Sequence, residues 1–246
     1  MNRLIDEPVD IAVVDYGMGN RRSVEKALEH VGAGAVVTND HDRLRAAAGL
    51  VVPGVGAFPK GMQRLRELGL DALLRELVAA GWPLLGICLG MQLAFERSSE
   101  QGGAEGLGIV AGDVRELPAA GIGERVATAG RTDDDEAAAK GNPAEARAGA
   151  LKLPHIGWNE VTLRRSSPLL EGLPDRCAFY HVHSFAPVPA DEQDVLGVSV
   201  YGEPFVSIVA HGSFYGVQFH PEKSSAAGLR LLANFAGICG RVPVAS

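Results

Sequence analysis

The sequence predicts an α/β protein whose mostly parallel sheet carries an antiparallel portion. In the first hundred residues, short apolar runs that end in glycine or proline alternate with segments of helical periodicity, as in βαβ units. Later, strand-like runs follow one another too closely for helices to lie between all of them, which indicates antiparallel pairing. We expect the 246 residues to form a single domain.

The candidate elements follow in chain order. The early strand candidates are the runs DIAVVDYG, GAVVTN, GLVVPG and WPLLGI, and the helical segments are residues 20–31, 59–80 and 90–97. The later strand candidates are EVTL, CAFYHV, DVLGVSV, FVSIVA and FYGVQF. The segment from Ser225 to about Cys239 has apolar residues at helical spacing and predicts a closing helix.

Residues 118–150 differ from the rest of the chain. They hold few bulky apolar side chains and much alanine, glycine and charge, so they bury too little surface to offset the entropy of ordering. We expect a flexible surface insertion within the domain. A regulatory or partner-binding arm, carried by the run Asp133-Asp134-Asp135, is the alternative.

Charge and composition exclude several classes of function. A net charge of −7 and a pI near 5.5 give no basic field for nucleic acid. No apolar stretch approaches the roughly 20 residues of a membrane span, and acids near the N-terminus argue against a signal peptide, so we expect a cytoplasmic protein. The three cysteines are far apart and odd in number, which indicates neither a disulfide framework nor a zinc cluster.

One cysteine has an unusual setting. Cys88 lies in GICLG, between an apolar run and a helical segment, and this order resembles the nucleophile elbow of G-x-S-x-G hydrolases. From such a turn we expect the side chain to be exposed at a helix N-terminus, where unpaired N–H groups favour a thiolate. The alternative is an ordinary buried cysteine at the end of a strand.

A base for this thiol is found in VQFHPEK, residues 217–223. In an extended segment His220 and Glu222 project to the same side, and Pro221 cannot continue a strand ladder. A thiolate, an imidazole and a carboxylate would form a triad in which the carboxylate fixes the imidazole tautomer. By itself, His-Pro-Glu is also compatible with an ordinary turn after a strand.

A site for a developing oxyanion is found in VVPGVGAF, residues 51–58. Its two glycines let the backbone approach a ligand closely, so N–H groups can turn toward a tetrahedral intermediate. The candidate donors are the amides of Val55 or Gly56, together with that of Leu89 beside the cysteine.

Taken together, these stretches carry a family resemblance. GICLGMQ, PGVGAF and GVQFHPEKS resemble the class I, triad-type glutamine amidotransferases, which implies a doubly wound α/β fold. DYGMGNRRSVEKAL, LPHIGWNEV and FYHVHSF narrow the resemblance to the glutaminase subunits of imidazole glycerol phosphate synthases. It covers most of the chain in order, and it fails only over the insertion.

The resemblance assigns roles to single residues. It implies Cys88 as the nucleophile, His220 as the acid and base, and Glu222 as the group that orients His220. The remaining implied roles concern glutamine: Gly54 to Gly56 match the oxyanion loop, Gln92 a side chain that holds the substrate, and Ser184 with Phe185 a backbone segment that receives its amino-acid end. The chain departs from the family at His181, which is usually an apolar aromatic residue, and at Phe185, which is often tyrosine.

The implied reaction is hydrolysis of glutamine through a cysteine thioester, without a metal or an organic cofactor. The ammonia then passes to a TIM-barrel cyclase subunit, which makes imidazole glycerol phosphate and aminoimidazole carboxamide ribotide in histidine biosynthesis. Because ligand sites form at the carboxyl ends of parallel strands, Trp158, Asn159 and Lys223 are candidates to contact that partner.

Two alternatives remain at this stage. The chain could be another cysteine hydrolase on the same scaffold, either a glutaminase subunit of a different amidotransferase or a free-standing enzyme. It could also be a non-catalytic α/β binding module that has kept a nucleophile-like turn. DYGMGN with PHIGWN argues against the first alternative, and the intact triad residues argue against the second.

Overall fold

The computed structural model describes residues 9–118 and 151–241. All but the first residue of the predicted insertion at 118–150 lies outside the described residues. The main sheet has the strand order β2-β1-β3-β4-β13-β12-β11-β8-β9. Its first five strands are parallel neighbours: β2 (Gly34–Thr38), β1 (Asp10–Val14), β3 (Gly49–Gly54), β4 (Leu84–Cys88) and β13 (Phe214–Val217).

The sheet continues with antiparallel strands. These are β12 (Glu203–His211), β11 (Val195–Tyr201), β8 (His155–Leu163) and β9 (Arg176–His183). β9 runs through Ser184 into β10 (Phe185–Pro189), which belongs to a second, four-stranded sheet. That sheet also contains β7 (Val110–Glu116), β5 (Phe95–Ser98) and β6 (Ala104–Glu105).

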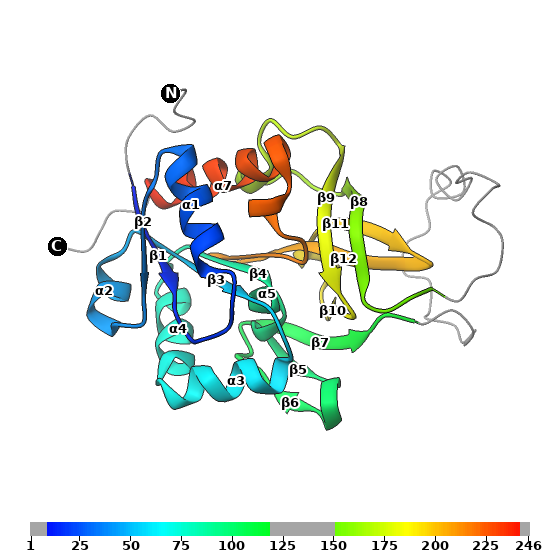
Figure 1. Ribbon diagram of the computed structural model, residues 1–246, viewed down its shortest axis with the longest axis horizontal. Helices are drawn as coiled ribbons and strands as arrows, with labels where there is room; N and C mark the ends of the chain where they lie inside the picture. Colours follow the sequence, from blue (N-terminus) through cyan, green and yellow to red (C-terminus); the bar gives the residue numbers. More distant parts are fainter. Residues whose placement is uncertain (1–8, 119–150, 242–246) are drawn as a thin grey trace.

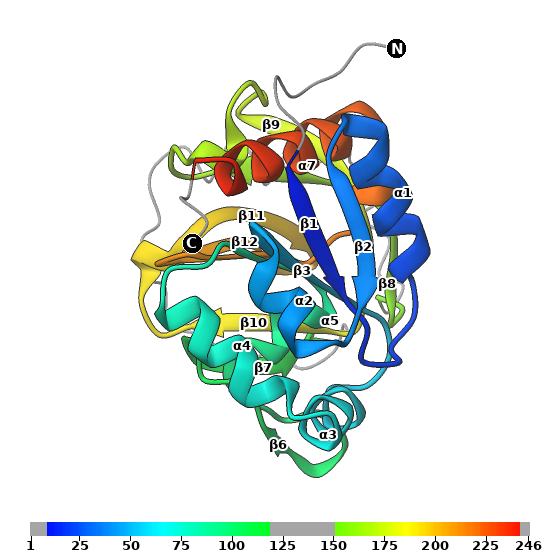
Figure 2. The ribbon, with the colours of Figure 1, turned by 90° about the vertical axis from the view of Figure 1, so that its left-hand side faces the viewer.

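Helices cover both faces of the parallel strands, so the expected α/β architecture is confirmed (Figures 1 and 2). Side chains alternate along β1: Ile11 and Val13 pack in one core cluster with α1 (Arg21–Val31) and α7 (Ser225–Cys239). Ala12 and Val14 pack in the other core cluster. The helices on that side are α2 (His41–Ala46), α3 (Phe58–Glu67) and α4 (Leu70–Ala79).

Two predicted helices differ from the structure. The segment 59–80 is two helices, because Gly69 adopts a left-handed φ of +65° between α3 and α4. The segment 90–97 is helical only as α5 (Leu89–Leu93), after which the chain turns into β5. There the tertiary pairing of Arg97 with Asp113 of β7 overrides the helical periodicity.

Strand register brings three distant segments to one edge of the main sheet. Gly54 lies opposite Cys88 in the β3–β4 pair, and Val217 lies opposite Ile87 in the β4–β13 pair. The candidate oxyanion loop, the elbow and the His-Pro-Glu segment therefore all leave the sheet at the carboxyl ends of neighbouring parallel strands. Among the helices of the described residues, none is long and apolar enough to cross a membrane.

Candidate active site

Cys88 occupies a strained turn between β4 and α5, and it is only 6% exposed, which corrects the expectation of an exposed side chain. Its φ of 54° and ψ of −110° are rare for a residue with a side chain. The flanking glycines serve close packing: a Cβ on Gly86 would lie 2.6 Å from the carbonyl oxygen of Gly90, and one on Gly90 would lie 1.7 Å from that of Val52. The two glycines therefore let strand and helix approach closely, while Cys88 itself carries the backbone strain.

His220 and Glu222 meet, although not through an extended chain. Residues Pro221–Lys223 form a short 3₁₀ helix, which corrects the predicted geometry. His220 Nδ1 lies 2.9 Å from Glu222 Oε1, and the two side chains are 1% and 0% exposed. The hydroxyl of Ser224 fixes this turn, because it donates to the His220 carbonyl at 2.6 Å and accepts from the N–H of Tyr180 at 3.0 Å.

The charge state of His220 is set by two neighbours. Burial alone would lower the pKa of His220, but hydrogen bonds to Cys88 and Glu222, together with their negative charges, raise it to about 10. The imidazole is thus an imidazolium near neutral pH when it lies between a thiolate and a carboxylate. This arrangement is typical of an activated cysteine nucleophile.

A buried pair of amides links the nucleophile to the start of β10. Gln218 Nε2 donates to the Cys88 sulfur at 3.7 Å, and Gln218 Oε1 accepts from Gln92 Nε2 at 3.0 Å. Gln92 Nε2 also donates to the carbonyl of Phe185 at 2.9 Å. The structure thus brings three sequence-predicted site residues, Cys88, Gln92 and Phe185, into one network. Ser184 lies beside them, between β9 and β10.

The loop after β3 has an exposed tip above a buried base. Gly54 is buried, and a Cβ there would lie 2.1 Å from the hydroxyl of Tyr16. Val55 is 41% exposed, and Gly56 follows it with a left-handed φ of 110°. Leu89 is the first residue of α5, directly after the nucleophile. The candidate oxyanion donors therefore come from two chain segments that meet at Cys88 and Gly54.

Three buried histidines lie behind β10. The carbonyl of Phe185 can only accept, so His183 Nδ1 donates to it at 2.9 Å and His183 Nε2 must accept from His155 Nδ1 at 3.1 Å. His155 Nε2 in turn accepts from the amide of Asn159 at 3.3 Å. Burial lowers the pKa of His181 to about 2 and that of His183 to about 3. The cluster is therefore neutral, as expected for structural histidines.

Two of the three predicted contact residues for a partner, Trp158 and Lys223, lie on one exposed surface around Tyr180, whereas Asn159, the next residue along β8, faces the other side of the sheet. Trp158 is 54% exposed, and its ring centroid lies 6.2 Å from that of Tyr180. The ammonium group of Lys223 lies 6.0 Å from the centre of the same Tyr180 ring. Asn159 donates to the carbonyl of Val200 at 2.9 Å. An exposed tryptophan next to a cation is more typical of a contact surface than of a core.

Sequence analysis missed three residues of this region: Asn20, Gln218 and Tyr180. Asn20 Nδ2 donates to Glu222 Oε1 at 2.5 Å, and Gln218 contacts the nucleophile. All three lie inside stretches that carry the family resemblance, DYGMGN, VQFHPEK and FYHVHSF. Their position in these stretches could have marked them as site residues. Contacts between stretches that are far apart in the chain, however, cannot be derived from a single sequence.

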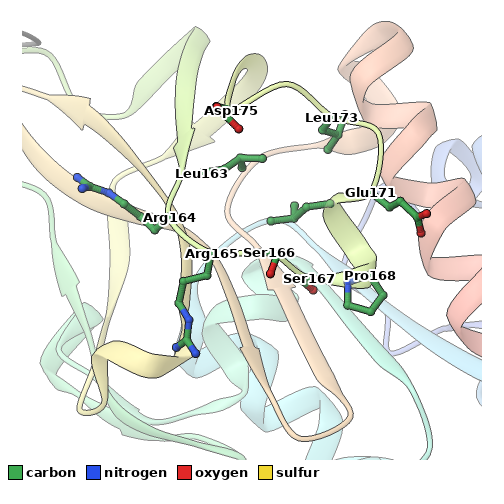
Figure 3. Close-up of a pocket in the computed structure, with 10 residues that line it drawn as sticks. Leu163, Arg164, Arg165, Ser166, Ser167, Pro168, Glu171, Leu173 and Asp175 are labelled. Carbon is green, nitrogen blue, oxygen red and sulfur yellow. The ribbon is translucent and has the colours of Figure 1, made fainter. Parts of the chain in front are cut away.

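Two pockets that the described residues form lie away from the triad. Within residues 9–118 and 151–241, no group of three His, Cys, Asp or Glu side chains is placed to hold a metal ion. A pocket of about 610 Å³ lies beyond the other end of β8, lined by residues from Leu163 to Asp175 (Figure 3). Its four charged side chains point in different directions, and none of the residues described above lines it.

Comparison with known proteins identifies the family of this chain. The family described as glutamine amidotransferase class-I matches residues 12–238. The imidazole glycerol phosphate synthase subunit HisH of Bacillus cereus (strain G9842) is 43% identical over 228 residues, which cover 93% of this chain and 94% of that protein. HisH of Aromatoleum aromaticum is 46% identical over 228 residues, covering 92% and 97%.

Solved structures agree on the fold. A crystal structure of a glutamine amidotransferase matches with a TM-score of 0.62 and 21% identity, covering 93% of this chain and 98% of that one. PurLQS from Thermotoga maritima matches with a TM-score of 0.61 and 14% identity, covering 94% and 99%. The chain belongs to the class I glutamine amidotransferases and, among them, to the HisH subunits of imidazole glycerol phosphate synthase.

Proposed function

We propose that this chain hydrolyses glutamine to glutamate and ammonia, with Cys88 as nucleophile, His220 as acid and base, and Glu222 as the group that orients His220. The single observation that carries the proposal is the fully buried His220–Glu222 pair, 2.9 Å apart, next to a cysteine held in a strained elbow. Strain of this kind is maintained where the surrounding structure requires it, which is typical of active sites.

The first half of the reaction forms a thioester. The Cys88 thiolate attacks the side-chain carbonyl carbon of glutamine, and the carbonyl oxygen becomes an oxyanion. Backbone N–H groups of Val55 or Gly56 and of Leu89 would stabilise that charge. The C–N bond then breaks, and the imidazolium of His220 protonates the leaving group, which departs as ammonia.

The second half returns the enzyme to its starting state. His220, now neutral, takes a proton from water as the oxygen attacks the thioester carbon. The C–S bond breaks, glutamate is released, and Cys88 regains its negative charge next to the imidazolium. Glu222 stabilises the imidazolium in both half-reactions and holds its ring orientation.

Substrate contacts are assigned to the residues around the elbow. Gln92 uses both N–H groups of its amide for Phe185 and Gln218, which fixes the side chain. Its carbonyl oxygen is then available to accept from the substrate. The backbone at Ser184 and Phe185 would receive the amino-acid end of glutamine, and the backbone of Gly54, at the base of the oxyanion loop, would contact the substrate.

The ammonia is delivered to a cyclase subunit that builds imidazole glycerol phosphate and aminoimidazole carboxamide ribotide. The names of the relatives as synthase subunits support this partner. Most free ammonia in water near neutral pH is protonated to ammonium, which is not a nucleophile, so direct transfer between subunits keeps the ammonia reactive. The surface of Trp158 and Lys223 around Tyr180 is the proposed contact for the partner, and Asn159 would contribute to it from the other face of β8.

A glutaminase assay tests both parts of the proposal. We expect turnover by the wild-type chain with its cyclase subunit and none by Cys88→Ala in the same complex. Trp158→Ala and Lys223→Ala should weaken binding of the cyclase subunit, whereas Arg75→Ala, an exposed residue of α4, should not. Undiminished binding by both surface variants would contradict the proposed interface, and activity in Cys88→Ala would contradict the proposed nucleophile.

A further inference from the structure

Asn20 is the last residue of the stretch DYGMGN. Its backbone conformation is unusual, and no hydrogen bond from its side chain to the neighbouring helix accounts for it. It lies just before α1 with φ 63° and ψ 2°, in the left-handed region. Residues at this position usually cap the helix with their side chains, but Asn20 makes no such hydrogen bond. Its amide is therefore used for something other than the start of α1.

The amide reaches across 202 residues of sequence to the triad. Asn20 Nδ2 donates to Glu222 Oε1 at 2.5 Å and lies 3.4 Å from His220 Nδ1. The orientation of the amide follows from chemistry, because its oxygen would be repelled by a carboxylate whereas its N–H₂ is attracted. A single carboxylate oxygen thus accepts from both His220 and Asn20.

Glu222 needs this second donor. Its side chain has no exposed surface, and Oε2 has no hydrogen-bond partner among the described residues. A buried carboxylate with few donors is costly and poorly fixed in orientation. Without the Asn20 amide, only His220 would hold the carboxylate, and the carboxylate could no longer define the direction of the ring.

We propose that Asn20 is a positioning residue of the glutaminase, which fixes the Glu222 carboxylate so that His220 is directed at Cys88. The inference rests on the proposed function, since it assigns a role within the same triad. This role also explains why asparagine occupies a left-handed position. Asparagine tolerates that conformation better than most residues with side chains, and its amide supplies an N–H donor.

Two substitutions test the role of the Asn20 side-chain amide while keeping the backbone conformation. Glycine and aspartate both tolerate a left-handed φ, so Asn20→Gly and Asn20→Asp keep the turn. Asn20→Gly removes the donor, and Asn20→Asp replaces it with an acceptor of the same shape. Gln101→Gly is the matched control, because Gln101 is an exposed residue with a φ of 50° that lies outside the site.

The readouts are glutaminase kinetics in the complex with the cyclase subunit and the rate of Cys88 alkylation by iodoacetamide. A hydrogen bond to a charged group is worth roughly a tenfold to hundredfold effect, and we expect a loss of kcat in this range for Asn20→Gly and Asn20→Asp. KM should change little, because the Asn20 side chain bonds to the triad and not to a proposed substrate-binding residue. Cys88 alkylation should slow by roughly tenfold in both variants, since His220 no longer supports the thiolate.

The outcomes are distinct. Wild-type kcat and wild-type alkylation rates in both variants would overturn the inference and leave Asn20 as a turn residue only. An equal loss in Gln101→Gly would overturn it as well, because the effect would then not be specific to the triad. If the wild-type complex has no glutaminase activity, the proposed function fails, and the alkylation rates still decide whether Asn20 orients the Cys88–His220 pair.

Discussion

Gly54 lies directly opposite Cys88 in the parallel pairing of β3 and β4. The loop that holds the candidate oxyanion donors therefore begins level with the nucleophile, one strand away. This relationship depends on close packing, because Gly54 sits against the hydroxyl of Tyr16, which is buried and has no hydrogen-bond partner within residues 9–118 and 151–241. Any change that separates β3 from β4 moves the oxyanion donors relative to the sulfur.

Gly90→Ala should disrupt the elbow and destabilise the fold. A methyl group at this position would lie 1.7 Å from the backbone carbonyl of Val52, which cannot rotate away as a side chain could. We expect the free energy of unfolding to fall by about 3 kcal/mol or more. Gly237→Ala is the control, because that helical position has open space and alanine should stabilise α7 by about 0.5–1 kcal/mol. Urea denaturation measures both, and equal stability of the two variants would contradict the packing argument.

Glu222→Gln should shift the pH dependence of glutaminase activity toward lower pH on its alkaline side. The carboxylate helps raise the pKa of His220 to about 10, so the imidazolium that protonates the leaving nitrogen persists until the pH approaches that value. Without the negative charge, burial lowers the pKa of His220 again, and the proton is lost at lower pH. The pH profile of kcat measures the shift, and an unchanged alkaline limb would show that Glu222 does not set the charge of His220.

The three cysteines should differ strongly in reactivity. Burial raises the pKa of Cys177 to about 11 and that of Cys239 to about 12, so neither forms much thiolate near neutral pH. Cys88 contacts the imidazolium and should react first with iodoacetamide. Peptide mapping by mass spectrometry after brief labelling checks the order, and modification of Cys239 before Cys88 would count against the elbow.

The buried histidines should make the protein sensitive to acid. The pKa of His181 falls from its ordinary value of 6.5 to about 2 in the folded state, so between these values the unfolded chain binds a proton that the folded chain does not. Stability is therefore lost as the pH falls below about 6.5. His181→Leu should reduce this slope, whereas His30→Leu, at an exposed position of α1, should not. Urea denaturation at about pH 5 and about pH 7.5 compares the slopes, and identical slopes in wild type and His181→Leu would refute the effect.

The strands and the chemical groups of the site could be predicted from the sequence, whereas the local backbone geometry of the site could not. Short apolar runs located β1 to β4, because burial on both faces of a sheet selects apolar residues at successive positions. Helical spacing located α7, because burial of one helix face repeats every three to four residues. The triad residues were found because each lies in a stretch of unusual composition at the end of a strand. The structure brings His220 and Glu222 together as expected.

Other features depend on contacts that no local pattern records. The His220–Glu222 pair forms through a 3₁₀ turn held by Ser224, where the spacing alone favoured an extended segment. β5 is a strand because β6 and β7, both from later in the chain, pair with it. Asn20 and Gln218 reach the triad from separate strand ends, and their roles become visible only when those ends meet.

The nucleophile is the central claim, and trapping its acyl intermediate tests it most directly. The wild-type complex with its cyclase subunit is mixed with glutamine, quenched in acid, and digested for mass spectrometry. We predict a glutamyl adduct on the peptide that contains Cys88, and neither adduct nor turnover in a folded Cys88→Ala variant. Glutamine hydrolysis by folded Cys88→Ala, or an adduct confined to Cys177 or Cys239, would contradict the account.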